Sequence, residues 1–181
     1  QIQHGQELYQ SRGLQQYGSV LGHGAYIGPD FTAEYLRLTT DAAVKQYREE
    51  GKQEPRELVK NEWRKENKYD ESSKTLNWTA GQTKGFDQMV NHYRDTLTKD
   101  NTSQGLFPNA IKSEEELHDL VAFFGWTAWA SAAERPNQDY TYTNNWPAEA
   151  NVDNKPTADL MVWSALSLIA LVGGTGLMFA I

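Results

Sequence analysis

The sequence predicts a mainly α-helical domain with long loops and an insertion, followed by a C-terminal transmembrane helix. Three observations predict this class: apolar residues recur at helical spacing between positions 86 and 97, a helix-capping pattern begins at Ser113, and positions 160–181 carry no charged residue. We expect residues 1–156 to form a domain outside the bilayer and residues 157–181 to form the span.

Composition narrows the function classes. The chain has 181 residues, a formal net charge of -7 and no cysteine. The acidic balance offers nothing to offset phosphate repulsion, so we expect no nucleic-acid partner. Disulfides, thiolate metal sites and cysteine nucleophiles are excluded together. The six Trp and nine Tyr fit a domain that lies on a membrane or a partner, and they equally fit a well-filled core.

Two helices are expected early in the chain. The first covers residues 6–12, where Gly13 closes it. Thr40 is expected to cap another helix over residues 41–50, because its hydroxyl can accept a bond from a first-turn amide.

The next helix is predicted over residues 55–66. Pro55 suits a first-turn position because its missing N–H would be unpaired there in any case. Leu58 and Trp63 are its apolar marks, and the many charges around them predict a solvated face. The fold of the charged insertion, residues 41–77, stays open.

Residues 85–98 should form an amphipathic helix with one buried stripe. Their apolar positions follow the spacing i, i+3, i+4, i+7, i+11, which keeps them on one helical face. The residues concerned are Phe86, Met89, Val90, Tyr93 and Leu97.

The best-defined helix begins at Ser113. Ser113 and Glu116 have the spacing of a capping box, in which each side chain satisfies an orphan amide of the first turn. The apolar face that follows consists of Leu117, Leu120, Val121 and Phe124, and it is widened by Phe123, Trp126 and Trp129. So broad a face predicts burial against a partner or the membrane interface as well as against the core.

Residues 135–156 are expected to form a loop or extended connector, because Asn, Pro and Asp dominate them. Tyr140, Tyr142 and Trp146 could place aromatic rings at the level of the lipid headgroups.

Residues 160–181 are predicted to cross the bilayer. As a helix they would be roughly 33 Å long at about 1.5 Å per residue, which is enough to span the hydrocarbon core. The alternative is a buried core helix. A stripe of small residues predicts close approach by further spans, which are expected downstream; it consists of Ser164, Ser167, Ala170 and Gly174.

The segment before the span predicts the orientation. Residues 132–159 contain two basic residues, Arg135 and Lys155, which is few for a cytoplasmic flank. The domain is therefore expected outside the cytoplasm. Since the first ten residues do not read as a signal peptide, an upstream signal or span is also expected.

Two stretches carry a family resemblance. They read GQELYQSRGLQQYGSVLGHGAYIGPDFTAEYL and LFPNAIKSEEELHDLVAFFGWTAWASAAERPNQDYTYTNNWPAE. Together with the following span, they resemble the N-terminal region of quinol-dependent nitric oxide reductases. That region is similar in turn to the haem-c subunit of the cytochrome-c-dependent enzymes, with its Cys-x-x-Cys-His, Gly-x-Gly-Ala-Tyr and Met-Pro-Asn patterns. The resemblance implies a cytochrome-c-like fold.

The haem-c ligands of those relatives are replaced at all four matching positions. Leu14 and Tyr17 stand where the thioether cysteines would be, Gly18 where the proximal histidine would be, and Phe107 where the axial methionine would be. The resemblance therefore implies that this domain binds no haem c, and that apolar or aromatic side chains fill the vacated volume.

The resemblance also implies a function for the whole protein. Such enzymes reduce two NO to nitrous oxide and water at a haem b3 and non-haem iron pair, with electrons from quinol passing through a second haem b. The iron-binding residues are expected in later membrane helices, so this segment is expected to be a noncatalytic cap. It would lie on the periplasmic or outer face of the inner membrane, contacting the downstream helices, quinol and the lipid bilayer. The alternative is a membrane-anchored scaffold module without a redox cofactor.

A calcium site is implied by the same relatives, in which the Gly-x-Gly-Ala-Tyr turn supplies ligands to an ion bridging haem propionates. The matching positions are Gly24, through its carbonyl, and Tyr26, through its phenol oxygen. The alternative is that Gly22, Gly24 and Gly28 simply allow tight turns.

The histidines suggest no metal centre. His4, His92 and His118 lack metal-ligand spacing and are expected to be ordinary surface or helix residues. His23 lies between two glycines, where it could hydrogen-bond a propionate or a neighbouring loop.

Asp30 and Glu34 are spaced like an acid–base pair, but a simpler interpretation is available. Asp30 follows Pro29 and can cap a helix over residues 31–38. We therefore assign no catalytic carboxylate.

Overall fold

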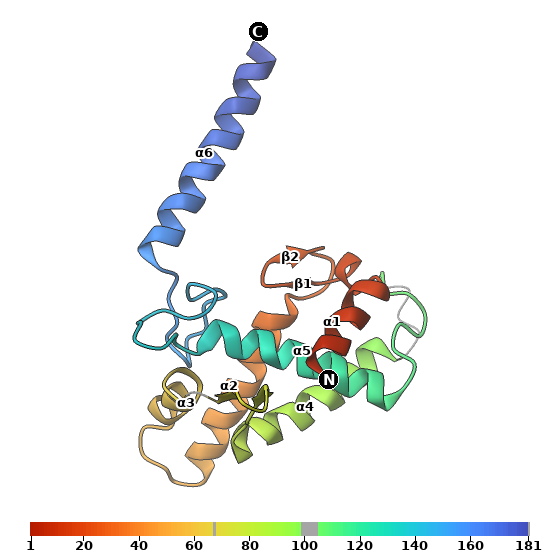
Figure 1. Cartoon of the computed structure of the whole chain (residues 1–181), viewed down its shortest axis with the longest axis vertical. Coiled ribbons are helices and arrows are strands. Elements are labelled where there is room, and N and C mark those ends of the chain that lie inside the picture. Colours follow the sequence, from red (N-terminus) through yellow and green to blue (C-terminus); the bar gives the residue numbers. More distant parts are fainter. Residues whose placement is uncertain (67, 99–104, 181) are drawn as a thin grey trace.

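The computed structural model describes residues 1–66, 68–98 and 105–180, and it is mainly helical as predicted (Figure 1). Ile181, the last residue of the predicted span, lies outside the described residues. The helices are α1 (Ile2–Ser11), α2 (Phe31–Glu49), α3 (Pro55–Arg64), α4 (Ala80–Leu97), α5 (Glu114–Ala132) and α6 (Ala158–Ala180), with a 3-10 turn η1 (Leu14–Gln16). Within the described residues, short strands form two antiparallel hairpins, β1 (Ser19–Val20) with β2 (His23–Gly24) and β3 (Tyr69–Asp70) with β4 (Thr75–Leu76).

Helix α5 runs through the middle of the helical body and packs against α1, α2 and α4 (Figure 1). Its predicted apolar face is confirmed, because Leu117, Leu120, Val121 and Phe124 are all buried. Phe123 and Trp129 are buried as well, whereas Trp126 is partly exposed. A helix that is apolar on most sides beyond its first turn is typical of one enclosed by other helices.

The start of α5 differs from the prediction in one detail. The Ser113 hydroxyl accepts a hydrogen bond from the Glu116 amide at 3.1 Å, as expected for an N-cap. The Glu116 carboxylate, however, accepts from the amide of Lys112 at 2.7 Å instead of the amide of Ser113. Its other oxygen accepts from Arg12 at 2.6 Å, which ties α5 to the end of α1.

The stripe predicted for α4 is confirmed, but the helix begins five residues earlier, at Ala80 rather than residue 85. Met89, Val90, Tyr93 and Leu97 are buried, and Phe86 packs partly buried against the core. The earlier start has a local cause. Thr79 and Gln82 form a reciprocal capping box that satisfies the first-turn amides.

The prediction of two helices over residues 31–38 and 41–50 is wrong, because α2 is one continuous helix. Thr40 is inside it and caps nothing. Its hydroxyl donates to the Leu36 carbonyl at 2.8 Å, so the polar group is satisfied by the preceding turn. Helix α1 also starts earlier than predicted, at Ile2 instead of residue 6.

The charged insertion contains α3 and the β3–β4 hairpin. Helix α3 begins at Pro55 as predicted, but Leu58 does not face inward: its side chain is exposed. Val59 is buried in its place together with Trp63. These two residues are four apart and therefore share one helical face.

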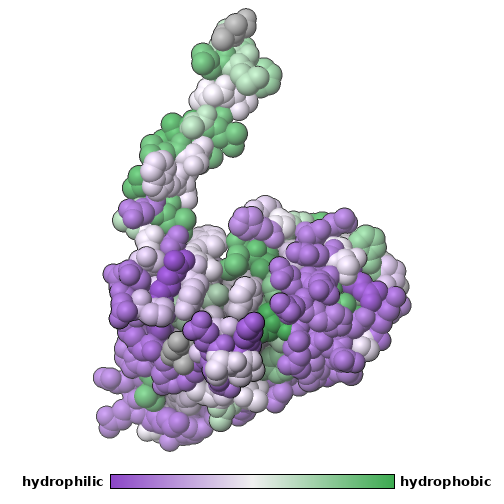
Figure 2. Space-filling model, viewed as in Figure 1, coloured by the Kyte–Doolittle hydropathy of each residue, from purple (hydrophilic) through white to green (hydrophobic). Residues whose placement is uncertain are grey.

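Helix α6 projects from the domain, and its surface is largely hydrophobic (Figures 1 and 2). None of its described residues is buried within the structure, so it is not a core helix. Its length of 23 residues and its apolar composition meet the requirements for crossing a bilayer. The protein is therefore membrane-associated.

Candidate functional site

The candidate site residues lie in the segment that joins α1 to α2. This segment contains η1 and the β1–β2 hairpin. Figure 1 shows the hairpin on the side of the domain from which α6 projects. Residues of the hairpin turn are consequently placed toward the same side as the predicted membrane.

Asp30 holds the hairpin against α2. One carboxylate oxygen accepts a hydrogen bond from the Ala33 amide at 2.9 Å, which confirms the predicted N-cap. The other oxygen accepts from the Ser19 hydroxyl at 2.8 Å and from the Gly22 amide at 2.7 Å. A single side chain therefore fixes both the start of α2 and the turn of the hairpin.

Tyr26 and Gly24 are both at the surface, where an ion could reach them. The Tyr26 side chain is 84% exposed, and its hydroxyl faces the Gly22 carbonyl across a long 3.4 Å. A carbonyl and a phenol are hard oxygen donors that suit calcium. The part of the chain that the structure describes contains no group of three His, Asp or Glu residues able to hold a metal. Any calcium here would need further ligands from elsewhere.

The glycines of this turn also have steric reasons to be glycine. Gly24 lies at φ 139°, a conformation that L side chains rarely adopt, and a Cβ there would lie 2.7 Å from the Gly18 carbonyl oxygen. A Cβ on Gly28 would lie 2.4 Å from the ring of Tyr17. Tight packing is thus sufficient to explain these glycines, and they do not by themselves indicate an ion.

The residues predicted to stand at haem-ligand positions are Leu14, Tyr17, Gly18 and Phe107, and none of them is a cysteine, histidine or methionine. Leu14 and Tyr17 are buried, as expected for side chains that fill the core. Phe107 is instead 55% exposed, and its ring lies 2.9 Å from where a Cβ on Gly13 would be. Without a sulfur atom or an imidazole, these residues do not fit a c-type haem.

A cluster of aromatic rings fills the space behind these positions, and the sequence pattern did not identify it. Phe31 stacks on Phe124 with ring centroids 4.3 Å apart and an interplanar angle of 4°. Tyr93 lies 5.7 Å from Phe31, Tyr9 lies 6.1 Å away and Tyr17 lies 6.3 Å away. The only sequence signal for Phe31 was its place directly after the N-cap, which says nothing of burial.

The tyrosines of this cluster stay protonated at neutral pH. Burial, with a contribution from the charge of Asp30, raises the pKa of Tyr9 to about 12. Burial raises the pKa of Tyr93 well above its ordinary value, and the neighbouring carboxylate of Glu34 adds to this. They therefore act as packing and hydrogen-bonding groups.

The four histidines lie in separate places. His4 pairs with Asp119 at 2.8 Å, and His118 lies against the ring of Phe86. His23 is exposed and its Nδ1 is 2.9 Å from the Leu21 carbonyl, so it bonds within its own turn.

Glu34 does not pair with Asp30 as an acid and base. It accepts a hydrogen bond from the Tyr93 hydroxyl at 2.9 Å and faces His92 at 3.5 Å. Burial opposes its ionisation, but the bonds from His92 and Tyr93 outweigh that effect and lower its pKa. The bond to Glu34 in turn raises the pKa of His92. The pair links α2 to α4.

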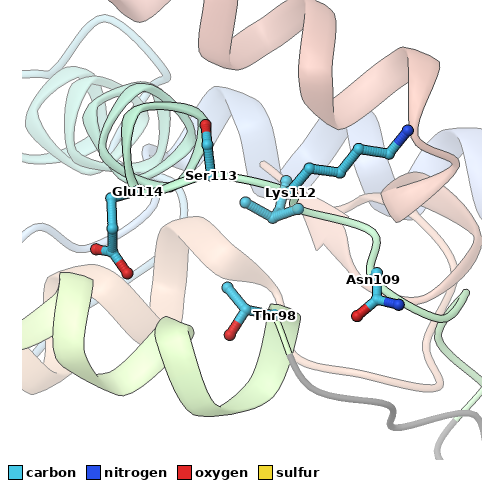
Figure 3. A pocket seen from close by; sticks show the side chains of 6 residues that line it. Thr98, Asn109, Lys112, Ser113 and Glu114 are labelled. Atoms are coloured by element: carbon cyan, nitrogen blue, oxygen red, sulfur yellow. The ribbon is translucent and has the colours of Figure 1, made fainter.

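A shallow hollow of about 390 Å³ lies between the end of α4 and the start of α5 (Figure 3). Its lining includes Thr98, Asn109 and Glu114, while Lys112 extends away from Thr98 and Glu114. The first turn of α5 contains three glutamates, which cancel the attraction of a helix N-terminus for anions. We assign no ligand to it.

The helical fold and the absence of cysteine from the sequence define a class: a cytochrome c-like domain without the thiols that attach haem c, followed by a candidate membrane helix. The family model for the cytochrome c-like domain of the nitric oxide reductase NorB matches residues 1–148. The chain belongs to this family. A comparison with curated proteins finds no match.

The His92–Glu34 pair predicts a pH-dependent contribution to stability. The raised pKa of His92 stabilises the fold below about pH 6.5, and this is lost as pH rises through the raised value. The lowered pKa of Glu34 stabilises it above about pH 4.5, and this is lost as pH falls. His92→Gln should therefore lower the free energy of unfolding more at pH 5.5 than at pH 8.5, measured by denaturant titration.

The matched control is His23→Gln, which removes an exposed imidazole bonded only to a backbone carbonyl in its own turn. At pH 5.5 it should lower the free energy of unfolding by less than His92→Gln does, because the His23 ring bonds to a backbone carbonyl and not to a carboxylate. An equal loss at both pH values for His92→Gln would contradict the assigned pair.

Proposed function

We propose that this chain is the noncatalytic N-terminal region of a quinol-dependent nitric oxide reductase. The proposal rests on the family match together with our assignment of Leu14, Tyr17, Gly18 and Phe107 to the four haem-ligand positions. A domain of this family without those ligands needs an electron source other than its own haem c, and quinol in the bilayer is such a source. Reduction of two NO to nitrous oxide and water would then take place in other segments, which would carry haem b, haem b3 and non-haem iron.

The domain itself acts as a cap over the outer ends of the membrane helices and helps to shape the quinol entrance. This role is supported by a group of large exposed side chains, which we name the lid face: Tyr26, Ile27, Phe107 and Trp146. They are 84%, 67%, 55% and 46% exposed respectively.

Two distances show which parts of the chain Ile27 and Trp146 lie beside. A Cβ built on Gly105, two residues before Phe107, would lie 3.5 Å from the Ile27 side chain. A Cβ built on Gly22 would lie 3.4 Å from the indole nitrogen of Trp146. The hairpin that contains Gly22 is on the α6 side of the domain (Figure 1). Such apolar surface is unfavourable in water and would be covered by a membrane-embedded core.

Tyr26 of the lid face and the nearby Gly24 also offer oxygen atoms that can bind a cation. We propose that the Gly24 carbonyl and the Tyr26 phenol oxygen contribute to a calcium ion that bridges the propionates of the two b-type haems. The remaining ligands, a carboxylate and the propionates, come from the membrane core. Both proposed donors are exposed, which a shared site requires.

The sparse basic residues before α6 support a position outside the cytoplasm. Arg135 and Lys155 are the two basic residues in positions 132–159, and basic residues concentrate on the cytoplasmic side of spans. We place residues 1–156 on the outer face of the inner membrane and residues 157–181 in the bilayer.

The first prediction concerns the electron donor. Membranes containing the full-length protein should consume NO and form nitrous oxide with a reduced quinol analogue, and not with reduced soluble cytochrome c. Membranes from the same host without the gene are the control. Turnover with cytochrome c alone would overturn the quinol assignment, and turnover with neither donor would favour the anchored scaffold module.

The second prediction concerns Tyr26. Tyr26→Phe in the intact enzyme should lower its calcium content, shift the haem b spectrum and reduce NO turnover, because one oxygen ligand is removed. Tyr142→Phe, which removes an exposed phenol of the connector, should leave all three unchanged. Calcium content and spectra equal to those of the wild type would remove Tyr26 as a ligand.

The third prediction concerns the lid face. Ile27→Asp should reduce NO turnover at least about tenfold, since a carboxylate placed against the membrane core is desolvated and a tenfold change needs only about 1.4 kcal/mol. Leu58→Asp, on the exposed face of α3, is the matched control. Neither change should alter the unfolding of the domain. Equal effects of the two variants on turnover would argue against this surface as the contact.

A further inference from the structure

We propose that the domain has lost the room for haem c as well as its ligands. The backbone next to Gly18 and the ring of Phe31 occupy the space that a proximal histidine needs. Restoring the four ligand residues would therefore not restore a cytochrome. This inference concerns the domain itself and is independent of which donor feeds the whole enzyme.

The first obstacle is the backbone opposite Gly18. A Cβ at this position would lie 2.5 Å from the carbonyl oxygen of Pro29, closer than the 3.0 Å below which real Cβ atoms are essentially never found. A backbone carbonyl has no alternative rotamer. Histidine at position 18 would therefore require the chain itself to move.

That movement is opposed by hydrogen bonds on both sides of the contact. The Gly18 amide donates to the Leu14 carbonyl at 3.0 Å, and the Gly18 carbonyl accepts from the Tyr9 hydroxyl at 2.9 Å. The next amide, of Ser19, donates to the Pro29 carbonyl at 3.0 Å. Separating Gly18 from Pro29 would break bonds in a buried region, where unpaired polar groups are costly.

The second obstacle is Phe31. Its ring carbon Cε2 would lie 2.7 Å from a Cβ on Gly18. Phe31 is fully buried and stacks on Phe124 at 4.3 Å, with the ring of Tyr93 at 5.7 Å. It has no free volume into which it could rotate, because interiors are packed to near-crystalline density.

Replacing Tyr17 by cysteine would remove one ring but would not open the site. The Tyr17 ring packs over Gly28, so its loss leaves a gap there. The Phe31–Phe124 stack would remain, and so would the contact between Gly18 and Pro29. Leu14, Tyr17 and Gly18 therefore face packed protein.

The main test restores the ligands in the full chain. The variant Leu14→Cys, Tyr17→Cys, Gly18→His, Phe107→Met is expressed in a host with the c-type haem maturation machinery and isolated from membranes. We expect no stoichiometric, covalently attached haem with the low-spin spectrum of His–Met coordination, judged by haem staining and optical spectra. Attachment of one haem per chain with that spectrum would overturn the proposal.

A second measurement keeps the proposal testable where the fourfold variant does not fold. Gly18→Ala adds only the Cβ, and overpacking of this kind should lower the Tm of the full chain by about 3–10 °C. Gly81→Ala in α4 is the matched control, because its Cβ would meet only side-chain ends, the nearest at 3.2 Å. Its Tm should stay the same or rise slightly. A wild-type Tm for Gly18→Ala would overturn the proposal whatever the fourfold variant does.

Discussion

The stacking of Phe31 on Phe124 is the contact on which the rest of the domain depends. The two rings join the first turn of α2 to the middle of α5, and both are fully buried. Tyr9 of α1 and Tyr93 of α4 meet the same pair edge-on, at 6.1 Å and 5.7 Å from Phe31. Rings from α1, α2, α4 and α5 therefore converge on one point. Since edge-to-face and offset pairs add to the gain from burial, this cluster fixes how the helices are arranged.

The residue next to Phe31 positions the surface that we assign to the membrane. Asp30 directly precedes Phe31, so the residue that begins the core also holds the hairpin through the Ser19 hydroxyl and the Gly22 amide. Tyr26 is four residues from Gly22 and shares its turn. An exposed loop is usually among the least stable parts of a domain. Here it is bonded to Asp30, the neighbour of the fully buried Phe31, which suits a loop that presents an apolar contact in a fixed position.

The sequence predicted the parts of the fold that local periodicity determines. Spacing identified the buried stripe of α4, and Ser113 identified the start of α5, because both signals act within one or two turns. Thr40 misled because a threonine hydroxyl can bond the previous turn as well as cap a new one. Phe31 was missed for a different reason: its partners come from sequence positions far apart, and no local pattern encodes such a meeting. The exposed lid face could not be found either, since exposure depends on what the rest of the chain leaves uncovered.

Hydrogen bonds to α2, α3 and α5 hold the segment that leads from α5 to α6. Directly before the connector, Glu134 accepts two bonds from Arg64 of α3, at 2.8 Å and 3.0 Å, and both side chains are largely buried. Asn151 donates to Asp41 of α2 at 2.7 Å, and Asn154 donates to the Ser131 and Pro147 carbonyls, each at 2.7 Å. These bonds hold the connector to the body on both sides of Trp146. A connector without such bonds would let the body and α6 turn independently, whereas this one is held to α2, α3 and α5 up to Asn154, four residues before α6 begins at Ala158.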